Sequence, residues 1–354
     1  MTTPGSDLDL RCVFARLGFI TSSQSMMSVL RCAHKAAHVS DVTVLLEGET
    51  GTGKQILAQA IHQLDRKRNI FPFVTVHCST ISEALAESEL FGHQRGAFSG
   101  AIGERKGLFQ SAEHGTLFLD DVNDLPLNLQ PKLLDVIQRG TVRPVGADRE
   151  LRVDVRIIAA CNQPLEGLVR EGRFRSDLFH RLNVVKLALP PLRNRPEDLS
   201  SLILAFASRH GALYSAITEV EAPLLGLLAT KVFQGNVREL ENAVQRMLFL
   251  KSEGASLGIK DWWAQSVSEG PDADADLFSD AASAAWKIIS LRGIPYAQAF
   301  QEIEKRVLQT AIKVHGPTRR EIAQRMHTSE RTLYYKLRAR GINGTTPKSQ
   351  DHAA

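Results

Sequence analysis

The sequence has little cysteine, no long apolar run and no secretion signal, and each absence excludes a class of protein. Its 4 cysteines, Cys12, Cys32, Cys78 and Cys161, are scattered without CxxC spacing, which excludes a disulfide framework and a zinc ribbon. No apolar run reaches the roughly 18 residues of a membrane span. The N-terminus is polar and acidic, without the basic-then-apolar order of a signal peptide. We therefore expect a cytoplasmic protein with reduced thiols and no membrane partner.

The composition is globular, but the charge is unevenly distributed. Hydrophobic residues make up 43% and charged residues 23% of the 354 residues, which excludes general disorder and corresponds to two or three domains. From Ala281 to Ala354, 13 lysines and arginines face 5 acidic residues, a net +8 in a chain of net +4. A basic end on a mildly acidic body predicts a polyanionic partner. The alternative is an ordinary solvated helical surface.

Short apolar runs alternate with helical patterns in the first half of the chain. The runs lack polar alternation, as strands do when both faces of a parallel sheet are buried; they are Val42–Leu46, Phe73–Val76, Thr116–Leu119, Val155–Ala160 and Val184–Leu189. Helical periodicity lies between them, for example at Lys54–Leu64 and Leu129–Arg139. The alternation predicts a layered α/β domain. From Glu197 to Lys251 only helical periodicity remains, and the acidic stretch Ser266–Asp280 predicts a linker.

A phosphate-binding loop follows the first apolar run. Residues 48–55 read GETGTGKQ, the G-x4-G-K spacing of a P-loop between a strand and a helix. Backbone N–H groups and the helix N-terminus favour phosphate, and Lys54 is expected to reach the β- and γ-phosphates. Gln55 stands where a hydroxyl ligand of Mg²⁺ is usual, so the metal needs another group. The expected nucleotide contacts are Gly48, Glu49, Thr50, Gly51, Thr52, Gly53, Lys54 and Gln55.

A second acidic motif completes the expected ATP site. Residues 115–122 read GTLFLDDV, an apolar strand that ends in two acids, which has the form of a Walker B motif. Asp120 is expected to hold Mg²⁺, because that ion prefers carboxylate and water oxygens. Asp121 is expected to orient and polarise the attacking water. An acidic strand-to-loop turn without catalytic function is the alternative.

A glycine-flanked segment gives the sequence its most specific resemblance. Residues 89–101 read ELFGHQRGAFSGA. With the P-loop and Walker B motifs, this segment resembles the sigma-54-dependent transcriptional activators, bacterial enhancer-binding proteins of the AAA+ class. The resemblance runs from about Gly18 to Ile342, and Ser99 stands where the family usually has threonine. It implies that a loop contacts sigma-54 and reports the nucleotide state to it; the loop comprises Gly96, Ala97, Phe98, Ser99, Gly100 and Ala101.

The resemblance also assigns roles to residues beyond these motifs. Leu129–Gly140 resembles the helix and second loop that support the sigma-contacting tip. Asn162 is similar to the sensor I position and Arg238 to sensor II. Arg175 and Arg181 match the trans-acting arginines, which stabilise phosphoryl-transfer charge from a neighbouring subunit and so imply a ring, a hexamer in this family. Surface ion pairs are the alternative for these two arginines.

Two departures from the family lie in the catalytic motifs. Asp121 stands where the family has glutamate, and His77 stands where it has the asparagine that pairs with this glutamate in a switch. The changes fall at partner positions, so a longer imidazole can meet a shorter carboxylate; the alternative is a core histidine with satisfied nitrogens. We expect ATP binding and weakened hydrolysis, because a displaced catalytic group can cost about 10²-fold in rate. A weak subunit in a mixed ring with a more active paralogue is the alternative function.

The C-terminal region resembles the Fis-type helix-turn-helix of the same family. Two helices are expected at Arg319–Met326 and Ser329–Arg340, with Ser329 as the N-cap and Gly341 ending the second helix. The second helix would enter the major groove, and phosphate contacts would dominate affinity. The expected DNA contacts are Arg319, Arg320, Ser329, Glu330, Arg331, Thr332, Tyr334, Tyr335, Lys336 and Arg338. A basic dimerisation hairpin is the alternative.

The expected organisation is that of an AAA+ activator without its own sensing domain. The boundaries are a tail at 1–17, the α/β ATPase subdomain at 18–192, the helical lid at 193–265, a linker at 266–285, the helix-turn-helix domain at 286–343 and a tail at 344–354. About 20 residues before the ATPase are too few for a regulatory domain of on the order of 100 residues, so a trans-acting regulator is expected. The expected partners are sigma-54 RNA polymerase holoenzyme and enhancer DNA. The GAFSGA segment argues against a AAA+ helicase or unfoldase.

Overall fold

The structure is a computed structural model that describes residues 7–80, 83–98, 101–210, 217–251, 254–262, 296–315, 322–323, 330–340 and 342. The chain divides into two compact units, Met1–Gln265 and Ser266–Ala354. Five residues of the predicted sites, Ser99, Gly100, Arg319, Arg320 and Ser329, lie outside the described residues.

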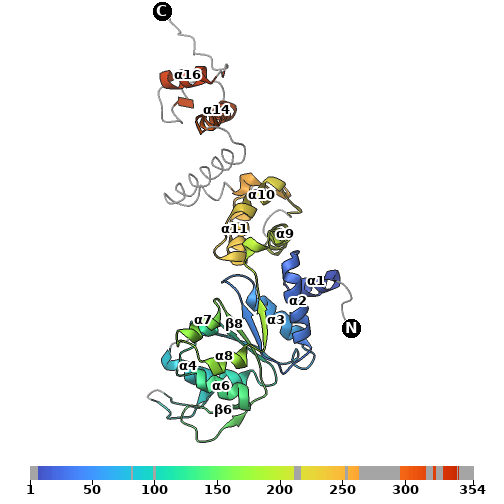
Figure 1. Ribbon diagram of the computed structural model, residues 1–354, viewed down its shortest axis with the longest axis vertical. Coiled ribbons are helices and arrows are strands. Elements are labelled where there is room, and N and C mark those ends of the chain that lie inside the picture. The colour runs from blue at the N-terminus through green and yellow to red at the C-terminus, as the bar shows by residue number, and fades with distance from the viewer. Residues whose placement is uncertain are drawn as a thin grey trace, which may run out of the picture. The chain divides into compact units, whose positions relative to one another are not determined.

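A five-stranded parallel sheet forms the centre of the first unit. Its order is β2-β5-β8-β1-β9, so neighbouring strands are joined through crossovers (Figure 1). The strands are β1 Val44–Glu47, β2 Phe73–His77, β5 Thr116–Asp120, β8 Arg156–Cys161 and β9 Val185–Ala188. These strands lie within two residues of the five apolar runs, because β5, β8 and β1 are buried on both faces and carry few polar residues.

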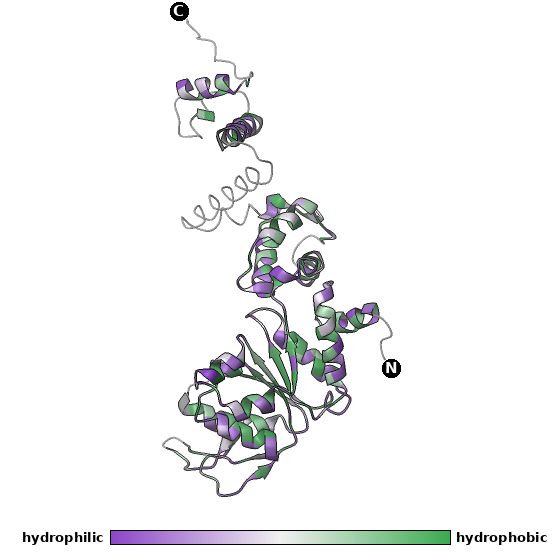
Figure 2. Cartoon of the chain, viewed as in Figure 1, coloured by the Kyte–Doolittle hydropathy of each residue, from purple (hydrophilic) through white to green (hydrophobic). Residues whose placement is uncertain are grey.

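Helices cover both faces of this sheet, which makes a three-layer sandwich (Figures 1 and 2). Alternate strand residues enter two cores: Leu45 and Leu117 pack with α4 to α8, whereas Leu46 and Phe118 pack with α1 to α3. The helices are α1 Asp7–Arg16, α2 Gln24–Ala37, α3 Lys54–Leu64, α4 Glu83–Phe91, α5 Leu108–Ser111, η1 Val122–Asp124, α6 Gln130–Arg139, α7 Leu165–Arg170 and α8 Ser176–Leu182. The α/β P-loop sandwich expected from the sequence is confirmed.

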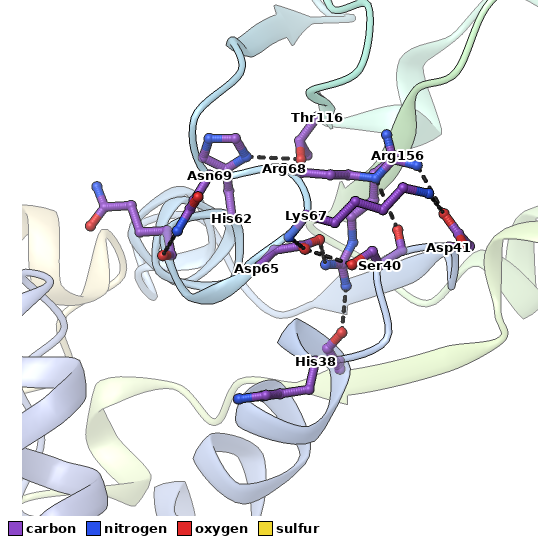
Figure 3. Close-up of polar contacts among 12 residues, drawn as sticks. His38, Ser40, Asp41, His62, Asp65, Lys67, Arg68, Asn69, Thr116 and Arg156 are labelled. Carbon is purple, nitrogen blue, oxygen red and sulfur yellow. Dashed lines mark hydrogen bonds and ion pairs between the residues drawn. The ribbon is translucent and has the colours of Figure 1, made fainter. Parts of the chain in front are cut away.

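Buried charges join the layers at the N-terminal ends of the strands (Figure 3). Arg156 begins β8 and donates to Asp65 over 2.6 Å, and both side chains are 0% exposed. It also donates to the carbonyl oxygen of Ala36 over 2.7 Å. The Asp65 carboxylate accepts in addition from the Ser40 hydroxyl and the Lys67 backbone N–H. One ion pair therefore ties the sheet to the ends of α2 and α3.

Two short hairpins extend from the α4–α8 face. They are β3 Gly92–His93 with β4 Arg105–Lys106, and β6 Thr141–Val142 with β7 Leu151–Arg152. The hairpins are linked, because His93 forms a parallel bridge with Val145 and Gln94 N–H donates to the Val145 carbonyl over 3.0 Å. The strands are two residues long, too short for period-2 alternation, and the sequence did not predict them.

A small helical subdomain completes the first unit. It contains η2 Leu192–Asn194, α9 Asp198–His210, α10 Ala222–Thr230 and α11 Asn236–Leu250 around a separate apolar core. A two-residue parallel pair, β10 Glu219–Val220 with β11 Ser256–Leu257, closes it. The purely helical pattern expected here was therefore incomplete.

The second unit contains α14 Tyr296–His315 and α16 Glu330–Ala339 among its described residues. Leu308, Ile322, Leu333 and Leu337 form its small buried core. The first predicted helix of the helix-turn-helix and the turn lie mostly outside the described residues, so that motif stays a prediction. Within the described part of the chain, no helix combines the length and apolar character needed to cross a bilayer.

Candidate nucleotide and partner sites

The P-loop forms a cradle between β1 and α3. Gly51 and Gly53 adopt φ of +77° and +104°, which side chains disfavour, and α3 begins at Lys54. The first N–H groups of a helix have no partner within the helix and are available to an anion. Lys54 lies inside the cradle, and its ammonium donates to the carbonyl oxygens of Gly48 over 2.7 Å and Glu49 over 3.2 Å.

Burial and the neighbouring carboxylates shift the pKa of Lys54 in opposite directions. Burial lowers the pKa of the Lys54 ammonium, while the charges of Asp120 and Asp121 oppose that shift and Arg238 adds to it. Lys54, the two carboxylates and Arg238 are thus close enough to influence one another. Thr50 is exposed in the loop, Thr52 is buried, and Gln55 is half-buried in the first turn of α3.

Polar residues occupy the C-terminal ends of neighbouring strands beside this cradle. His77 ends β2, Asp120 ends β5 and Asn162 follows β8, next to β1 and its P-loop. Ligands of open parallel sheets bind outside the carboxyl ends of the strands. Three motifs separated by 42 or more positions in the sequence are therefore brought to one edge of the sheet.

The two Walker B carboxylates have different neighbours. Asp120 Oδ2 lies 3.3 Å from His77 Nδ1, and these residues are register partners in β2 and β5. Asp121 lies beyond the strand end with φ of +51°, and its Oδ1 accepts from Asn162 Nδ2 over 3.2 Å. The structure shows different neighbours from the expected pairing of His77 with Asp121: strand register places His77 beside Asp120, and the left-handed turn directs Asp121 to Asn162.

These donors fit a magnesium ion that is bound together with phosphate. Among the described residues, no group of three or more His, Cys, Asp or Glu side chains forms a protein-only metal site. Mg²⁺ is usually held by one or two carboxylates with water and phosphate oxygens. The Asp120 carboxylate is 19% exposed and near Lys54, which suits this arrangement.

An ion pair and hydrogen bonds join the helical lid directly to the P-loop. Arg193 forms a bidentate pair with Glu49 at 2.6 and 2.8 Å, and Asn236 Nδ2 donates to the Thr50 carbonyl over 3.0 Å. Hydrogen bonds from Arg193, and then from Asn236, lower the pKa of Glu49 to about 2. A Cβ on Gly51 would lie 2.1 Å from the Gly235 carbonyl oxygen, so the backbones of the loop and the lid are in direct contact here.

A buried residue that sequence analysis did not select reinforces this junction. Arg195, with a side chain 2% exposed, donates to the Thr52 carbonyl over 2.8 Å and lies 3.5 Å from Asp198. Asp198 accepts from the Thr21 hydroxyl and the Ser23 backbone N–H. The charged run that follows Pro190–Pro191 marks Arg193 and Arg195, but only the tertiary structure connects it to the P-loop.

The predicted trans-acting arginines lie on the surface of α8. Arg175 lies at the N-cap position of α8 without a side-chain capping hydrogen bond and pairs with Asp177 at 2.7 Å, with both side chains more than two-fifths exposed. Arg181 is exposed in the last turn. Gln130 Oε1 accepts from the Arg175 backbone N–H, which connects this corner to α6.

The glycine-flanked loop is closed and presents its aromatic residue. Gly96 N–H donates to the Ala101 carbonyl over 2.9 Å, and Ala101 N–H donates to the Phe98 carbonyl over 3.0 Å. The Phe98 residue is 39% exposed and its ring lies edge-on to His93, 5.1 Å between centroids. The described part of this loop, which we call the finger (Gly96–Phe98 and Ala101), thus projects from the β3–β4 hairpin with its apolar group accessible.

The predicted DNA-contacting helix α16 has one buried and one exposed side. Leu333 and Leu337 are buried, as expected, and the remaining residues from Glu330 to Arg338 are exposed. These exposed residues are Glu330, Arg331, Thr332, Tyr334, Tyr335, Lys336 and Arg338. Lys336 is already paired, because Glu304 of α14 accepts from it over 2.8 Å. Its charge is therefore less available to a phosphate.

Known proteins share this arrangement. Residues 19–188 match the Sigma-54 interaction domain, and residues 193–275 match the AAA+ ATPase lid domain. The chain is 37% identical over 325 residues to the regulatory protein AtoC of Escherichia coli K12, covering 92% of this chain and 68% of AtoC. It is 48% identical over 243 residues to the DNA-binding transcriptional activator HyfR of the same strain, covering 68% of this chain and 36% of HyfR.

A solved structure supports the same grouping. The crystal structure of NtrX from Brucella abortus in complex with ATP is similar with a TM-score of 0.61 and 29% identity, covering 91% of this chain and 69% of NtrX. The chain therefore shares the Sigma-54 interaction domain with this family and is 37% identical to AtoC across two thirds of that protein. This chain belongs to the sigma-54-dependent transcriptional activators of the AAA+ class.

Proposed function

We propose that the chain is an ATP-driven activator that remodels sigma-54 RNA polymerase holoenzyme from the closed to the open promoter complex. The observation that carries the proposal is the joint presence, in one unit, of a P-loop with carboxylates at the strand ends and an accessible finger. The chain runs from β2, whose last residue His77 lies 3.3 Å from the Asp120 carboxylate, through α4, which ends at Phe91 directly before β3. A nucleotide-dependent shift at the strand ends therefore has a short route to the finger.

Different residues around the P-loop have different roles in ATP hydrolysis. The P-loop N–H groups and Lys54 bind the phosphates, and Arg238 at the start of α11 approaches from the lid. Asp120 would hold Mg²⁺ together with phosphate oxygens, and the ion would supply charge neutralisation at the phosphates. Asp121 orients the attacking water. Arg175 and Arg181 serve the site of a neighbouring copy or a paralogue in a ring, which is a hexamer in this family.

The second unit supplies enhancer binding in this proposal. Arg331 and Arg338 are exposed on α16 beside two exposed tyrosines, and the region from Ala281 onward carries a net +8. Arginines can pair with base edges as well as phosphates, whereas the polyanionic backbone provides most of the affinity.

Steady-state phosphate release by the purified full chain tests the catalytic part. Wild-type protein is expected to release phosphate from ATP in the presence of Mg²⁺, and Lys54→Ala is the control because it removes the phosphate-binding cation. Release that does not exceed this control, with or without enhancer DNA, would remove the enzymatic proposal for the chain alone.

The short, restrained Asp121 favours a second candidate: a weakly catalytic subunit in a mixed ring. Asn162 donates to its carboxylate over 3.2 Å, and the side chain is one methylene shorter than the family's glutamate. In that case phosphate release would be low for the chain alone and would change when a paralogue is added. An Asp121→Glu variant should then be faster than wild type.

The finger is tested separately in reconstituted transcription from a sigma-54 promoter. Phe98→Ala removes the accessible aromatic ring, and Ser99→Ala removes the hydroxyl at the family's threonine position. Both variants should lose activation while retaining the wild-type rate of phosphate release, because neither residue belongs to the cradle. Normal activation by both would show that the finger is not the contact.

A further inference from the structure

We propose that His77 is a positioning residue that orients the metal-holding carboxylate of Asp120, rather than the partner of Asp121. The inference rests on the proposed function, since it assigns a role within the same nucleotide site. It differs from the pairing implied by family resemblance, in which this position restrains the second acid of the Walker B motif.

The sheet fixes the two residues opposite each other. His77 and Asp120 are register partners at the ends of β2 and β5. Beyond that pair, Cys78 N–H donates to the Asp120 carbonyl over 3.0 Å. The His77 carbonyl accepts from both the backbone N–H and the hydroxyl of Thr80, at 3.1 and 3.0 Å. Both backbones are therefore held opposite each other, and the side chains place Nδ1 and Oδ2 3.3 Å apart.

The second carboxylate is restrained from the opposite side. Asp121 departs from the strand in a left-handed conformation, and Asn162 at the end of β8 donates to it. Asn162 is itself anchored, because its backbone N–H donates to Asn123 Oδ1 over 3.4 Å. Each acid of the motif thus has its own neighbour, on a different adjacent strand.

The division of neighbours has a chemical consequence for Asp120. In this proposal the imidazole, with Nδ1 3.3 Å from Oδ2, restrains the orientation of the carboxylate and leaves Oδ1 for a metal ion. Groups that orient a metal-binding side chain typically change metal affinity by about 10- to 100-fold. His77 is 49% exposed at the side chain, so its contribution lies at the lower end of this range. The expected effect on Mg²⁺ is therefore about tenfold.

The test measures binding rather than turnover. A fluorescent ATP analogue is titrated into the full chain at fixed Mg²⁺ concentrations and in EDTA, for wild type, His77→Ala and His77→Asn. The amide nitrogen of asparagine can occupy the position of imidazole Nδ1, which makes His77→Asn the conservative variant. Thermal unfolding of each variant reports whether the fold is retained.

We expect His77→Ala to raise the Mg²⁺ concentration for half-maximal enhancement of nucleotide binding about tenfold, while affinity in EDTA stays at the wild-type value. His77→Asn should restore at least half of the loss on a logarithmic scale. An unchanged Mg²⁺ requirement in His77→Ala, or an equal defect in both variants, would overturn the assignment. If wild type bound no nucleotide at all, the proposed function itself would fail, and this outcome is distinct from the first two.

Discussion

Removal of one partner from the buried Asp65–Arg156 pair should destabilise the first unit strongly and unequally. Asp65→Ala leaves a guanidinium at 0% exposure that, among the described residues, retains the Ala36 carbonyl as its one acceptor. Breaking a fully buried pair in this way costs about 3–5 kcal/mol. For a unit of this size, 1 kcal/mol corresponds to roughly 2–4 °C in Tm, so we expect a decrease of roughly 6–20 °C.

The reciprocal variant should be milder because Asp65 keeps other donors. In Arg156→Met, the carboxylate still accepts from the Ser40 hydroxyl at 2.6 Å and from the Lys67 N–H at 3.0 Å. Methionine also fills much of the space of the arginine chain. We expect about 1–3 kcal/mol, and the double variant Asp65→Leu with Arg156→Met should recover part of the loss, since apolar replacements of buried pairs are often neutral.

Urea unfolding followed by circular dichroism measures these differences in the full chain. Asp7→Ala is the matched control, because it breaks the exposed Arg31–Asp7 pair and should leave the midpoint unchanged. Thermal scans give the corresponding shifts in Tm. If Arg156→Met were as costly as Asp65→Ala, or if Asp65→Ala changed stability no more than the control, the reasoning from desolvated charge would be refuted.

Three further predictions concern the lid and the DNA site. Gly51→Ala should weaken nucleotide binding by about tenfold or more in an equilibrium titration, since positive φ and a 2.1 Å approach both forbid a Cβ and cost at least about 1–2 kcal/mol. The Glu49–Arg193 pair lowers the pKa of the Glu49 carboxyl from 4.5 to about 2, so the stabilisation by this pair is present above pH 4.5 and disappears as the pH falls toward 2. The difference in urea midpoint between wild type and Glu49→Gln should therefore shrink from pH 6 to pH 3. A difference that stays constant would contradict the pairing. Arg331→Ala should weaken enhancer binding in a fixed-salt gel-shift assay more than Lys336→Ala, because Lys336 already donates to Glu304. The reverse order would argue against α16 as the reading helix.

The sequence predicted those parts of the fold whose causes are local. The helix Lys54–Leu64 was predicted at both ends because a glycine loop precedes it and the apolar pattern stops at Asp65. The central strands were recognisable because burial on two faces excludes polar residues from them. The P-loop was indicated by its residue spacing and the Walker B motif by an apolar run that ends in two acids, and the structure brings the two together at one edge of the sheet.

The unpredicted parts depend on contacts between distant segments. Arg193 meets Glu49 across 144 positions, and no local pattern indicates this pair. The proximity of His77 to Asp120 was not predicted, because it depends on strand register and on the left-handed turn at Asp121. Both hairpins were missed because their strands are too short to produce a periodic signal.

The linkage between the hairpins means that the direction of the finger is determined partly outside its own sequence. Gly146, in the connection between β6 and β7, has no room for a side chain, because a Cβ there would lie 2.9 Å from the Cβ of Ala97. Val145 meanwhile exchanges backbone hydrogen bonds with Gly92 and Gln94. A chimera that received only the GAFTGA segment of a relative would therefore place that segment against this protein's own β6–β7 hairpin. Transfer of a relative's specificity requires the exchange of both hairpins together.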